Sequence, residues 1–349
     1  LLVLLAALLA LPVIWVETSC QAPGPARQMQ TLDLKEERYK RAEGDSFLTF
    51  PEWYIVHAYA DLAGVTRQSS ESSFDYVSSV LGFWRSLCEA TRTAGGVGTV
   101  TFDQKVTNHI IGASFTVEFA IKGLWERTVG ALSYWTRGAA RTAEDEFALK
   151  LLDDYAAFLR QTPWYQFPFL SELARFWRET PASGDSVVRK WERRLAMSLE
   201  YAGKALYAVP IGWLAGASPA DLEIKSVVRG LDDADLKAEP RIERLRDLGD
   251  GLTLVRTPRY RAFTEIARGL GARGRSFVEI AGNKRILVTV LAPAGGRFEA
   301  PGAREIFSLD IQSTPGWRRY GLLTEVEALA ALIGVVETQG AKFEHAYDY

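Results

Sequence analysis

Residues 1–16 form an uninterrupted apolar run at the start of the chain, and this run constrains the fold more than any other feature. It contains no charged residue and one proline, Pro12, and it ends with Trp15 and Val16 just before Glu17. A helix that packs onto the body of a globular protein is disfavoured, because such a helix normally keeps a polar face, and this run has none. We therefore expect a membrane segment, followed by protein that folds beside the membrane.

Three interpretations of this run stay open. It is shorter than the stretch of about 20 apolar residues that spans a bilayer, but it starts with leucine, so we expect further residues before it. The favoured interpretation is a signal anchor with Trp15 at the membrane interface. The second is the apolar part of a cleaved signal peptide, and the third is a lipoprotein signal with Cys20 as the lipidated residue, against which Glu17 argues. The expected membrane contacts are Leu2, Leu5, Leu9, Ile14, Trp15 and, far along the chain, Trp213.

Composition bounds the remaining possibilities. A chain of 349 residues is long enough for two domains after the first segment. Its net charge of −2 gives no basic excess, so we expect no nucleic-acid partner. The two cysteines, Cys20 and Cys88, predict no disulfide framework, and the apolar neighbours of Cys88 favour a buried thiol. Three histidines and two cysteines spread along the chain argue against a metal or haem site, so we expect no cofactor.

The texture of the sequence divides the chain into four parts. Pro23, Gly24 and Pro25 indicate an extended linker after the apolar run. Aromatic-rich helical patterns follow, and from about Gly251 strands alternate with shorter helices. We predict a membrane anchor or signal segment at residues 1–20, a linker and charged helix at 21–41, a helical domain at 42–230 and a ferredoxin-like α+β domain at 231–349.

Two stretches of the helical part are unusual. Residues 106–135 are apolar nearly all round, with Glu118, Lys122 and Glu126 at four-residue spacing, which predicts a helix central in a bundle or lying against a membrane. Residues 189–217 begin with four basic residues and become uncharged from residue 205, with Pro210 expected to break the helix. This second stretch predicts either a basic helix in the membrane interface or, slightly favoured, a core helix with a solvated arginine face. Thr142 with Asp145 predicts a helix N-cap.

The last third predicts an α+β fold. Strands are expected at residues 252–256, 276–281, 285–291, 305–311, 318–322 and 341–347, and helices at 258–273 and 325–339. The turn at Gly282 and Asn283 predicts a hairpin between the second and third of these strands. Two strand-helix-strand units in this order are typical of a ferredoxin-like sandwich.

Four segments carry a resemblance to known sequences. They read FPEWY at residues 50–54, RKWERR at 189–194, FVEIAGN at 277–283 and EHAYDY at 344–349. In these segments the chain resembles a group of bacterial, membrane-anchored proteins of unknown activity, and the resemblance covers most of its length. It implies a membrane-anchored protein but no activity, and hence no functional residues.

The candidate catalytic residues are polar groups in apolar surroundings: Glu52, His57, His109 and Glu118. His109 and Glu118 are nine residues apart, half a turn out of phase, so they cannot share one helix face. A paired Glu118 and Lys122 would be structural rather than catalytic, because pairing is how buried charges are tolerated. The sequence contains no nucleophile elbow, phosphate-binding loop or zinc-protease motif.

These observations predict a membrane-anchored extrinsic accessory or scaffold subunit that contacts a membrane protein complex or the bilayer surface. The alternative is an envelope enzyme, or a protein that binds a small ligand or lipid, with a pocket between the two domains. We expect the bilayer and a membrane protein complex as partners. We expect the protein at the cell membrane, held by its N-terminal segment, with its body on the periplasmic side.

Overall fold

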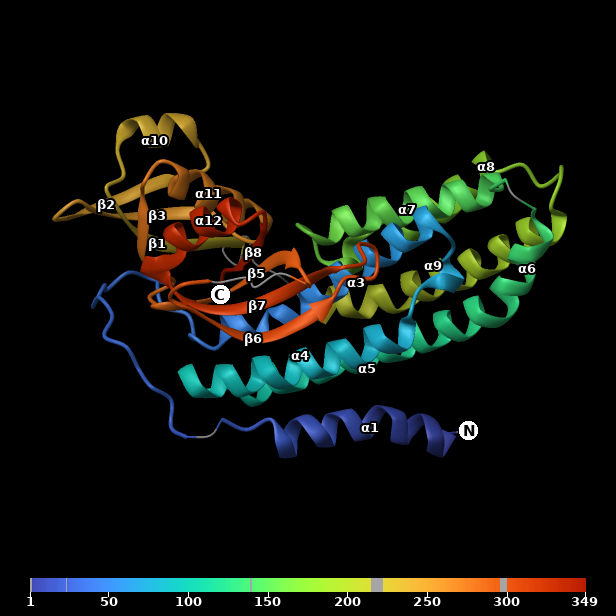
Figure 1. Ribbon diagram of the computed structural model, residues 1–349, viewed down its shortest axis with the longest axis horizontal. Coiled ribbons are helices and arrows are strands. Elements are labelled where there is room, and N and C mark those ends of the chain that lie inside the picture. The colour runs from blue at the N-terminus through green and yellow to red at the C-terminus, as the bar shows by residue number, and fades with distance from the viewer. Residues whose placement is uncertain (1, 23, 139, 215–221, 296–299) are drawn as a thin grey trace.

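The computed structural model describes residues 2–22, 24–138, 140–214, 222–295 and 300–349. Its first two thirds are helical, and its last third forms two antiparallel sheets with helices packed on them (Figure 1). The predicted α+β class, with a helical N-terminal region and a C-terminal sheet region, is therefore confirmed.

The helical region is built from long helices joined by short turns. Its main helices are α1 (Leu2–Ser19), α2 (Asp45–Leu48), α3 (Phe50–Gln68), α4 (Tyr76–Val97), α5 (Phe102–Trp125), α6 (Ala131–Thr136), α7 (Ala143–Leu159), α8 (Phe169–Glu179) and α9 (Val187–Leu214). Short turns of helix lie between them at η1 (Glu71–Ser73), η2 (Glu126–Gly130) and η3 (Trp164–Gln166). The predicted cap at Thr142 is confirmed, because Thr142 and Asp145 form a reciprocal capping box at the start of α7.

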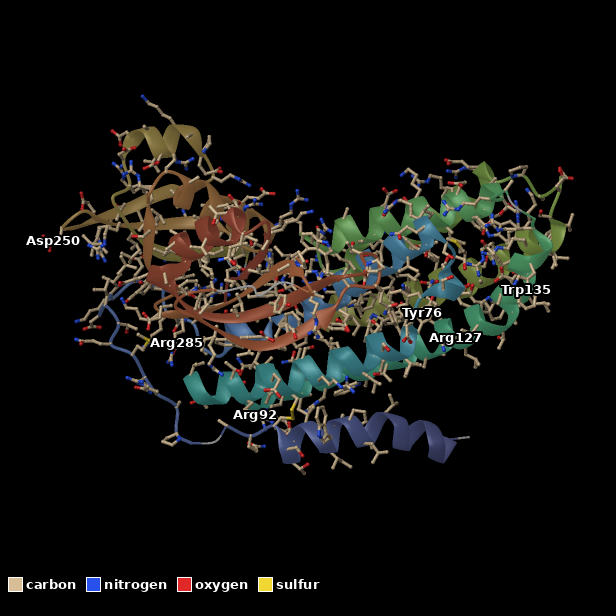
Figure 2. The ribbon with its side chains drawn as sticks, in the orientation of Figure 1. Tyr76, Arg92, Arg127, Trp135, Asp250 and Arg285 are labelled. Carbon is tan, nitrogen blue, oxygen red and sulfur yellow. A yellow bond between two sulfur atoms is a disulfide. The ribbon has the colours of Figure 1, made fainter. Side chains whose placement is uncertain are left out.

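Helix α1 lies along α4 and α5 at one edge of the molecule (Figure 1). Val16 and Cys20 point into the core of the helical region, and Cys20 is disulfide-bonded to Cys88 of α4. Arg92 of α4, labelled in Figure 2, donates to the carbonyl oxygen of Ser19 at 3.1 Å. The expectation of no disulfide is therefore wrong, and the Cys20 sulfur is not free for the lipid considered above.

Removing this disulfide is expected to loosen α1. The bond joins residues 68 apart in sequence, and cross-links of this kind typically contribute about 2–4 kcal/mol to stability. A Cys20→Ser/Cys88→Ser variant should unfold at lower urea concentration by this amount, and limited proteolysis should cut it first between α1 and α2. Equal protease resistance of the variant and the oxidised parent would contradict the pairing.

None of the helices in the described part of the chain is both long enough and apolar enough to cross a membrane. The membrane anchor expected for residues 1–20 stays a prediction. The outward side of α1 is nevertheless apolar, since Leu11, Ile14 and Trp15 are exposed.

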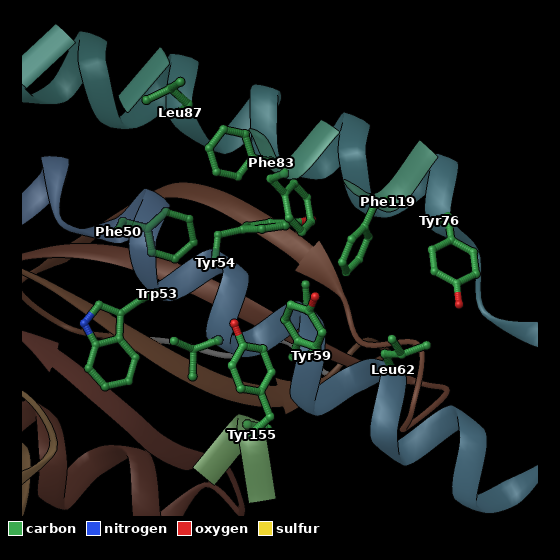
Figure 3. Packing of buried hydrophobic residues seen from close by; sticks show 14 of the residues in the cluster. Phe50, Trp53, Tyr54, Tyr59, Leu62, Tyr76, Phe83, Leu87, Phe119 and Tyr155 are labelled. Carbon is green, nitrogen blue, oxygen red and sulfur yellow. The ribbon is translucent and has the colours of Figure 1, made fainter. Parts of the chain in front are cut away.

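Aromatic side chains fill the core between α3, α4 and α5. Figure 3 shows Tyr54 of α3 beside Phe83 of α4, with their ring centroids 5.5 Å apart. Helices α4 and α5 approach closely at Gly112 of α5. A Cβ added there would lie 2.6 Å from Cε1 of Phe83 and 2.8 Å from Trp84, both on α4. Glycine is needed here because the rings occupy the space of a side chain.

The sheet region contains two four-stranded sheets with the same strand order. Its elements are β1 (Glu223–Arg229), α10 (Asp233–Ala238), β2 (Glu243–Gly249), β3 (Leu252–Pro258), α11 (Arg261–Ala272), β4 (Ser276–Ile280), β5 (Arg285–Pro293), β6 (Ala303–Asp310), β7 (Trp317–Glu325), η5 (Val326–Ala328), α12 (Leu329–Thr338) and β8 (Lys342–Tyr347). The orders are β2-β3-β1-β4 and β6-β7-β5-β8, with all neighbours antiparallel. Helices α11 and α12 contact each other and strands of both sheets, so the two sheets share one core.

The hairpin predicted around Gly282 is wrong. Strand β4 belongs to the first sheet and β5 to the second, and only one bridge joins Ile280 and Asn283. The backbone N–H of Arg41 donates to the Ala281 carbonyl, and the Asn283 amide donates to the Arg41 carbonyl. The turn is thus held by the segment before α2, and it carries the chain from one sheet to the other.

The charged helix predicted at residues 31–41 is also wrong, because this segment runs without helix across the outer face of the first sheet. Tyr39 is buried there with Val227, Leu254 and Val278. Its hydroxyl donates to the buried carboxylate of Glu279 at 2.7 Å. These long-range contacts outweigh the local helical tendency of a charged segment.

The second sheet packs directly against the helical region. Phe50 of α3 contacts Phe307 of β6, with ring centroids 4.4 Å apart. Ser46 of α2 donates to the Tyr347 carbonyl and accepts from the Leu287 N–H, at 2.6 and 2.9 Å. The helices and the sheet therefore share a continuous hydrophobic core.

Candidate functional site

Helix α9 buries its charged side and exposes its apolar side. Its seven charged residues are buried or, for Glu200, half-buried: Arg189, Lys190, Glu192, Arg193, Arg194, Glu200 and Lys204. None of its exposed residues up to position 213 is charged, and apart from Tyr207 they are apolar, including Trp191, Leu195, Leu199, Leu206 and Trp213. Leu206 is 79% exposed and Trp213 is 85% exposed. Neither predicted form of this segment, a basic interfacial helix or a core helix with a solvated arginine face, matches this arrangement.

The helix continues through Pro210, where a break was predicted. Proline removes one backbone hydrogen bond and normally kinks or ends a helix. Here Pro210 lies close to the end of α9 at Leu214, so little helix remains beyond it.

Helix α5 also keeps most of its charged residues away from the surface. Between Asp103 and Arg127 it has no exposed charged residue, while Ile110, Ile121 and Leu124 are exposed. A capping box between Thr101 and Gln104 starts this helix. After α5 the chain continues as helix through η2 and α6. Trp135, near the end of α6, is exposed (Figure 2).

A groove of about 600 Å³ lies between α5 and α9. Its walls are apolar and include Val117, Ile121, Trp125 and Leu199. Seven charged residues also line it: Glu71, Glu118, Lys122, Glu126, Arg193, Glu200 and Lys204. The exposed apolar residues of α5 and α9 border the groove, because Ile121 of α5 and Leu199 of α9 are exposed and also line the groove.

Lys122 of α5 lies at the middle of the charged lining. Its Nζ is 2.8 Å from Glu200 Oε2 and 3.1 Å from Glu71 Oε2. Burial alone would lower the pKa of Lys122, but the Glu200 and Glu71 carboxylates outweigh burial and raise it well above its ordinary value. Lys122 is therefore a cation shared by two carboxylates.

Lys204 of α9 forms a second shared contact. Its Nζ is 2.7 Å from Glu118 Oε1, 3.0 Å from Glu200 Oε1 and 2.7 Å from the Tyr59 hydroxyl. The Tyr59 hydroxyl also bonds to Glu118. Burial would raise the pKa of Glu200, but Lys122 and Lys204 outweigh it and hold the pKa well below its usual range. The candidate Glu118 thus pairs with Lys204.

Arg193 of α9 is the third cation of the charged lining. This side chain is 2% exposed, and its guanidinium contacts Glu71 at 3.0 Å, Glu126 at 2.5 Å and Glu192 at 2.6 Å. Burial raises the pKa of Glu126; Arg193 opposes this rise and the Glu71 carboxylate adds to it, so the pKa lies above its ordinary value. Glu126 begins the π-helical turn η2, a local irregularity often found at functional sites.

The other candidate residues lie elsewhere. His109 bonds through Nε2 to Glu17 of α1 at 2.8 Å, so it faces α1 while Glu118 faces α9, as their nine-residue separation requires. Glu52 is exposed in the first turn of α3. The structure does not bring Glu52, His57, His109 and Glu118 into one site.

His57 lies at the contact between α3 and the second sheet. Its Nδ1 is 3.6 Å from Glu344, which accepts two hydrogen bonds from Arg319 at 2.6 and 2.8 Å. Its Nε2 is 3.2 Å from the Tyr347 hydroxyl. Burial, with Arg319 adding to it, lowers the pKa of His57 to about 3 despite Glu344. A histidine held neutral between helix and sheet is a structural element of this contact.

His345 completes this buried pair of histidines. Its ring centroid lies 3.6 Å from that of Trp53, and its Nδ1 is 2.9 Å from the Thr264 hydroxyl. Burial, with His57 adding to it, lowers the pKa of His345 well below its ordinary value.

Of the expected membrane contacts, Ile14, Trp15 and Trp213 are exposed and Leu9 is partly exposed. The side chains of Leu2 and Leu5 lie outside the described part of the structure. In the described part of the chain, no group of three or more histidine, cysteine, aspartate or glutamate side chains is placed to hold a metal ion.

Sequence reasoning missed most of the charged groove. Glu71, Arg193, Glu200 and Lys204 were not singled out as site residues, although Glu200 and Lys204 are four apart on a helix. The signal in the sequence that could have found two of them is that Glu200 and Lys204 are charged residues in the otherwise apolar stretch 195–213. Comparisons of the chain with protein-family models, curated proteins and solved structures gave no match.

Proposed function

We propose that this is an accessory or scaffold protein of a membrane surface, which rests with the apolar faces of α5 and α9 in the lipid of the bilayer. The observation that carries the proposal is the inverted polarity of α9. A helix exposed to water places its charges outward, whereas α9 buries its charges and exposes uncharged, mostly apolar side chains. Contiguous exposed apolar surface of this extent marks contact with a membrane or a partner.

Three features favour lipid as the occupant. Helix α5, next to α9 across the groove, also exposes no charge from residue 104 to residue 126. The outer side of α1, which packs along α5, adds Leu11, Ile14 and Trp15 to the apolar surface. Tryptophans such as Trp15, Trp135 and Trp213 are enriched at membrane interfaces.

The remaining parts of the proposal concern place and fold. The Cys20–Cys88 disulfide supports a body outside the cytoplasm, because disulfides persist in oxidising compartments. The order β1-α10-β2-β3-α11-β4 supports a ferredoxin-like description of the first sheet, and the second sheet repeats the strand order. In this proposal the sheet region faces away from the lipid and is available to a membrane protein complex.

Flotation with neutral phosphatidylcholine vesicles tests the proposal. Because burying each leucine contributes about 1.5–3 kcal/mol, a Leu199→Glu/Leu206→Glu variant should bind vesicles at least ~100-fold more weakly than the parent. The control Ala157→Glu/Gln161→Glu adds the same charge at exposed positions in and just after α7. The control should float like the parent. Equal flotation of the parent and the Leu199 and Leu206 variant would contradict lipid contact by this face.

A further inference from the structure

The groove between α5 and α9 combines an apolar rim with a charged floor. The rim residues Ile121 and Leu199 are exposed, whereas Glu71 and Arg193 in the floor are 4% and 2% exposed. A molecule that entered from the lipid would meet apolar side chains first and charges last. This profile matches an amphiphile whose head group lies inside and whose chain points outward.

The floor has one more carboxylate than cation. Its acids are Glu71, Glu118, Glu126 and Glu200, four in all, and its bases are Lys122, Arg193 and Lys204, three in all. The ion pairs continue outward from Arg193 through Glu192, Arg189, Asp145 and Arg137 in turn, which adds two acids and two bases and leaves the same excess of one negative charge. The groove can therefore accept one further positive charge.

The lysines of the floor are already engaged with acids. Lys122 lies between Glu71 and Glu200, and Lys204 between Glu118 and Glu200. An anionic head group would have to displace these carboxylates, which carry charge of the same sign as itself. The acids around Arg193 have the fewest cations, in contrast: among the ion pairs of the described residues, Glu126 pairs only with Arg193, which Glu71 and Glu192 share.

We propose that this groove binds an amphiphile with a single ammonium head group, which lies on the carboxylates of the floor with its alkyl chain along Ile121 and Leu199. The proposal rests on the proposed lipid contact only for the route by which the ligand arrives. Binding itself depends on the charge balance of the groove. Glu126, next to Glu71 across Arg193, is the carboxylate whose neutralisation removes the excess charge.

Binding to the full chain in uncharged detergent micelles tests this proposal. Equilibrium dialysis with dodecylamine, dodecanol and dodecanoate at neutral pH compares one chain length with three head groups. We expect one dodecylamine per chain, bound at least tenfold more tightly than the other two. Glu126→Gln should lower the dodecylamine affinity at least tenfold, and Glu146→Gln, an exposed position on α7, should leave it unchanged.

The outcomes separate the two proposals. Equal binding of the three probes, tighter binding of dodecanoate, or unchanged dodecylamine binding by a folded Glu126→Gln variant would overturn the ammonium site. Vesicle flotation of Glu126→Gln should equal that of the parent. If dodecylamine binds as expected but the parent does not float, the groove is a site for amphiphiles that does not face lipid.

Discussion

Replacement of Arg193 by alanine is expected to destabilise the protein by about 3–5 kcal/mol, the cost typical of breaking a buried ion pair by removing one partner. Arg193 is 2% exposed and contacts the carboxylates of Glu71, Glu126 and Glu192. Without the guanidinium these acids remain buried with too little positive charge nearby. Urea unfolding in uncharged detergent should show the loss as a lower transition midpoint.

The matched control is Arg178→Ala, an exposed arginine on α8. It should change the free energy of unfolding by less than about 0.5 kcal/mol, as surface substitutions usually do. Arg193→Lys keeps the charge but loses the planar fork that reaches three acids, so its stability should lie between those of the parent and the alanine variant. An Arg193→Ala variant as stable as the control would show that the ion pairs of Arg193 do not stabilise the fold.

Acid is expected to destabilise the contact between α3 and the second sheet. The pKa of His57 is lowered to about 3 and that of His345 well below its ordinary value, because both rings are buried. Arg319, Arg160 and Glu344 face these rings, and only Glu344 favours protonation. The stabilisation from the neutral rings is complete above pH 6.5 and is lost as the pH falls toward 3.

The size of this effect follows from linkage. Keeping His57 neutral costs about 1.4 kcal/mol per pH unit below pH ~6.5, so this ring accounts for about 2.5 kcal/mol at pH ~4.5, and the lowered pKa of His345 acts in the same direction. The free energy of unfolding, measured by urea titration at several pH values, should fall with this slope. His57→Gln and His345→Asn should each reduce the slope. A slope unchanged in both variants would exclude these histidines as its source.

Local signals in the sequence predicted much of the secondary structure. The cap at Thr142, the apolar helix around Glu118 and the alternation of strands and helices after Gly251 all depend on neighbouring residues, and the structure has them. Features that depend on distant contacts were not predictable in this way. The pairing of Cys20 with Cys88 and the crossing from β4 to β5 at Gly282 are set by how α1 and residue 41 pack.

The candidate site shows the same limit more sharply. The spacing of charges on α9 reveals that they share one side of the helix, but not whether that side faces water or protein. The expectation of a solvated arginine face followed the usual rule for soluble proteins. In the structure the acids of η1, α5, η2 and α7 supply partners for these cations, so the charged side is buried and the apolar side is exposed. Only the tertiary arrangement reveals this inversion.

The most direct test of lipid contact is the surroundings of α9 in a vesicle-bound sample. The two cysteines of the chain are joined in a disulfide, so Leu199→Cys and Leu206→Cys each introduce one thiol for a nitroxide label. Lys150→Cys on α7 and Lys237→Cys on α10 are exposed controls. Paramagnetic resonance compares label collisions with oxygen, which concentrates in lipid, and with a water-soluble nickel complex. We expect positions 199 and 206 to collide mainly with oxygen and the two controls with nickel. Nickel collisions as frequent at 199 and 206 as at the controls would show that this face is in water and would contradict the proposed function.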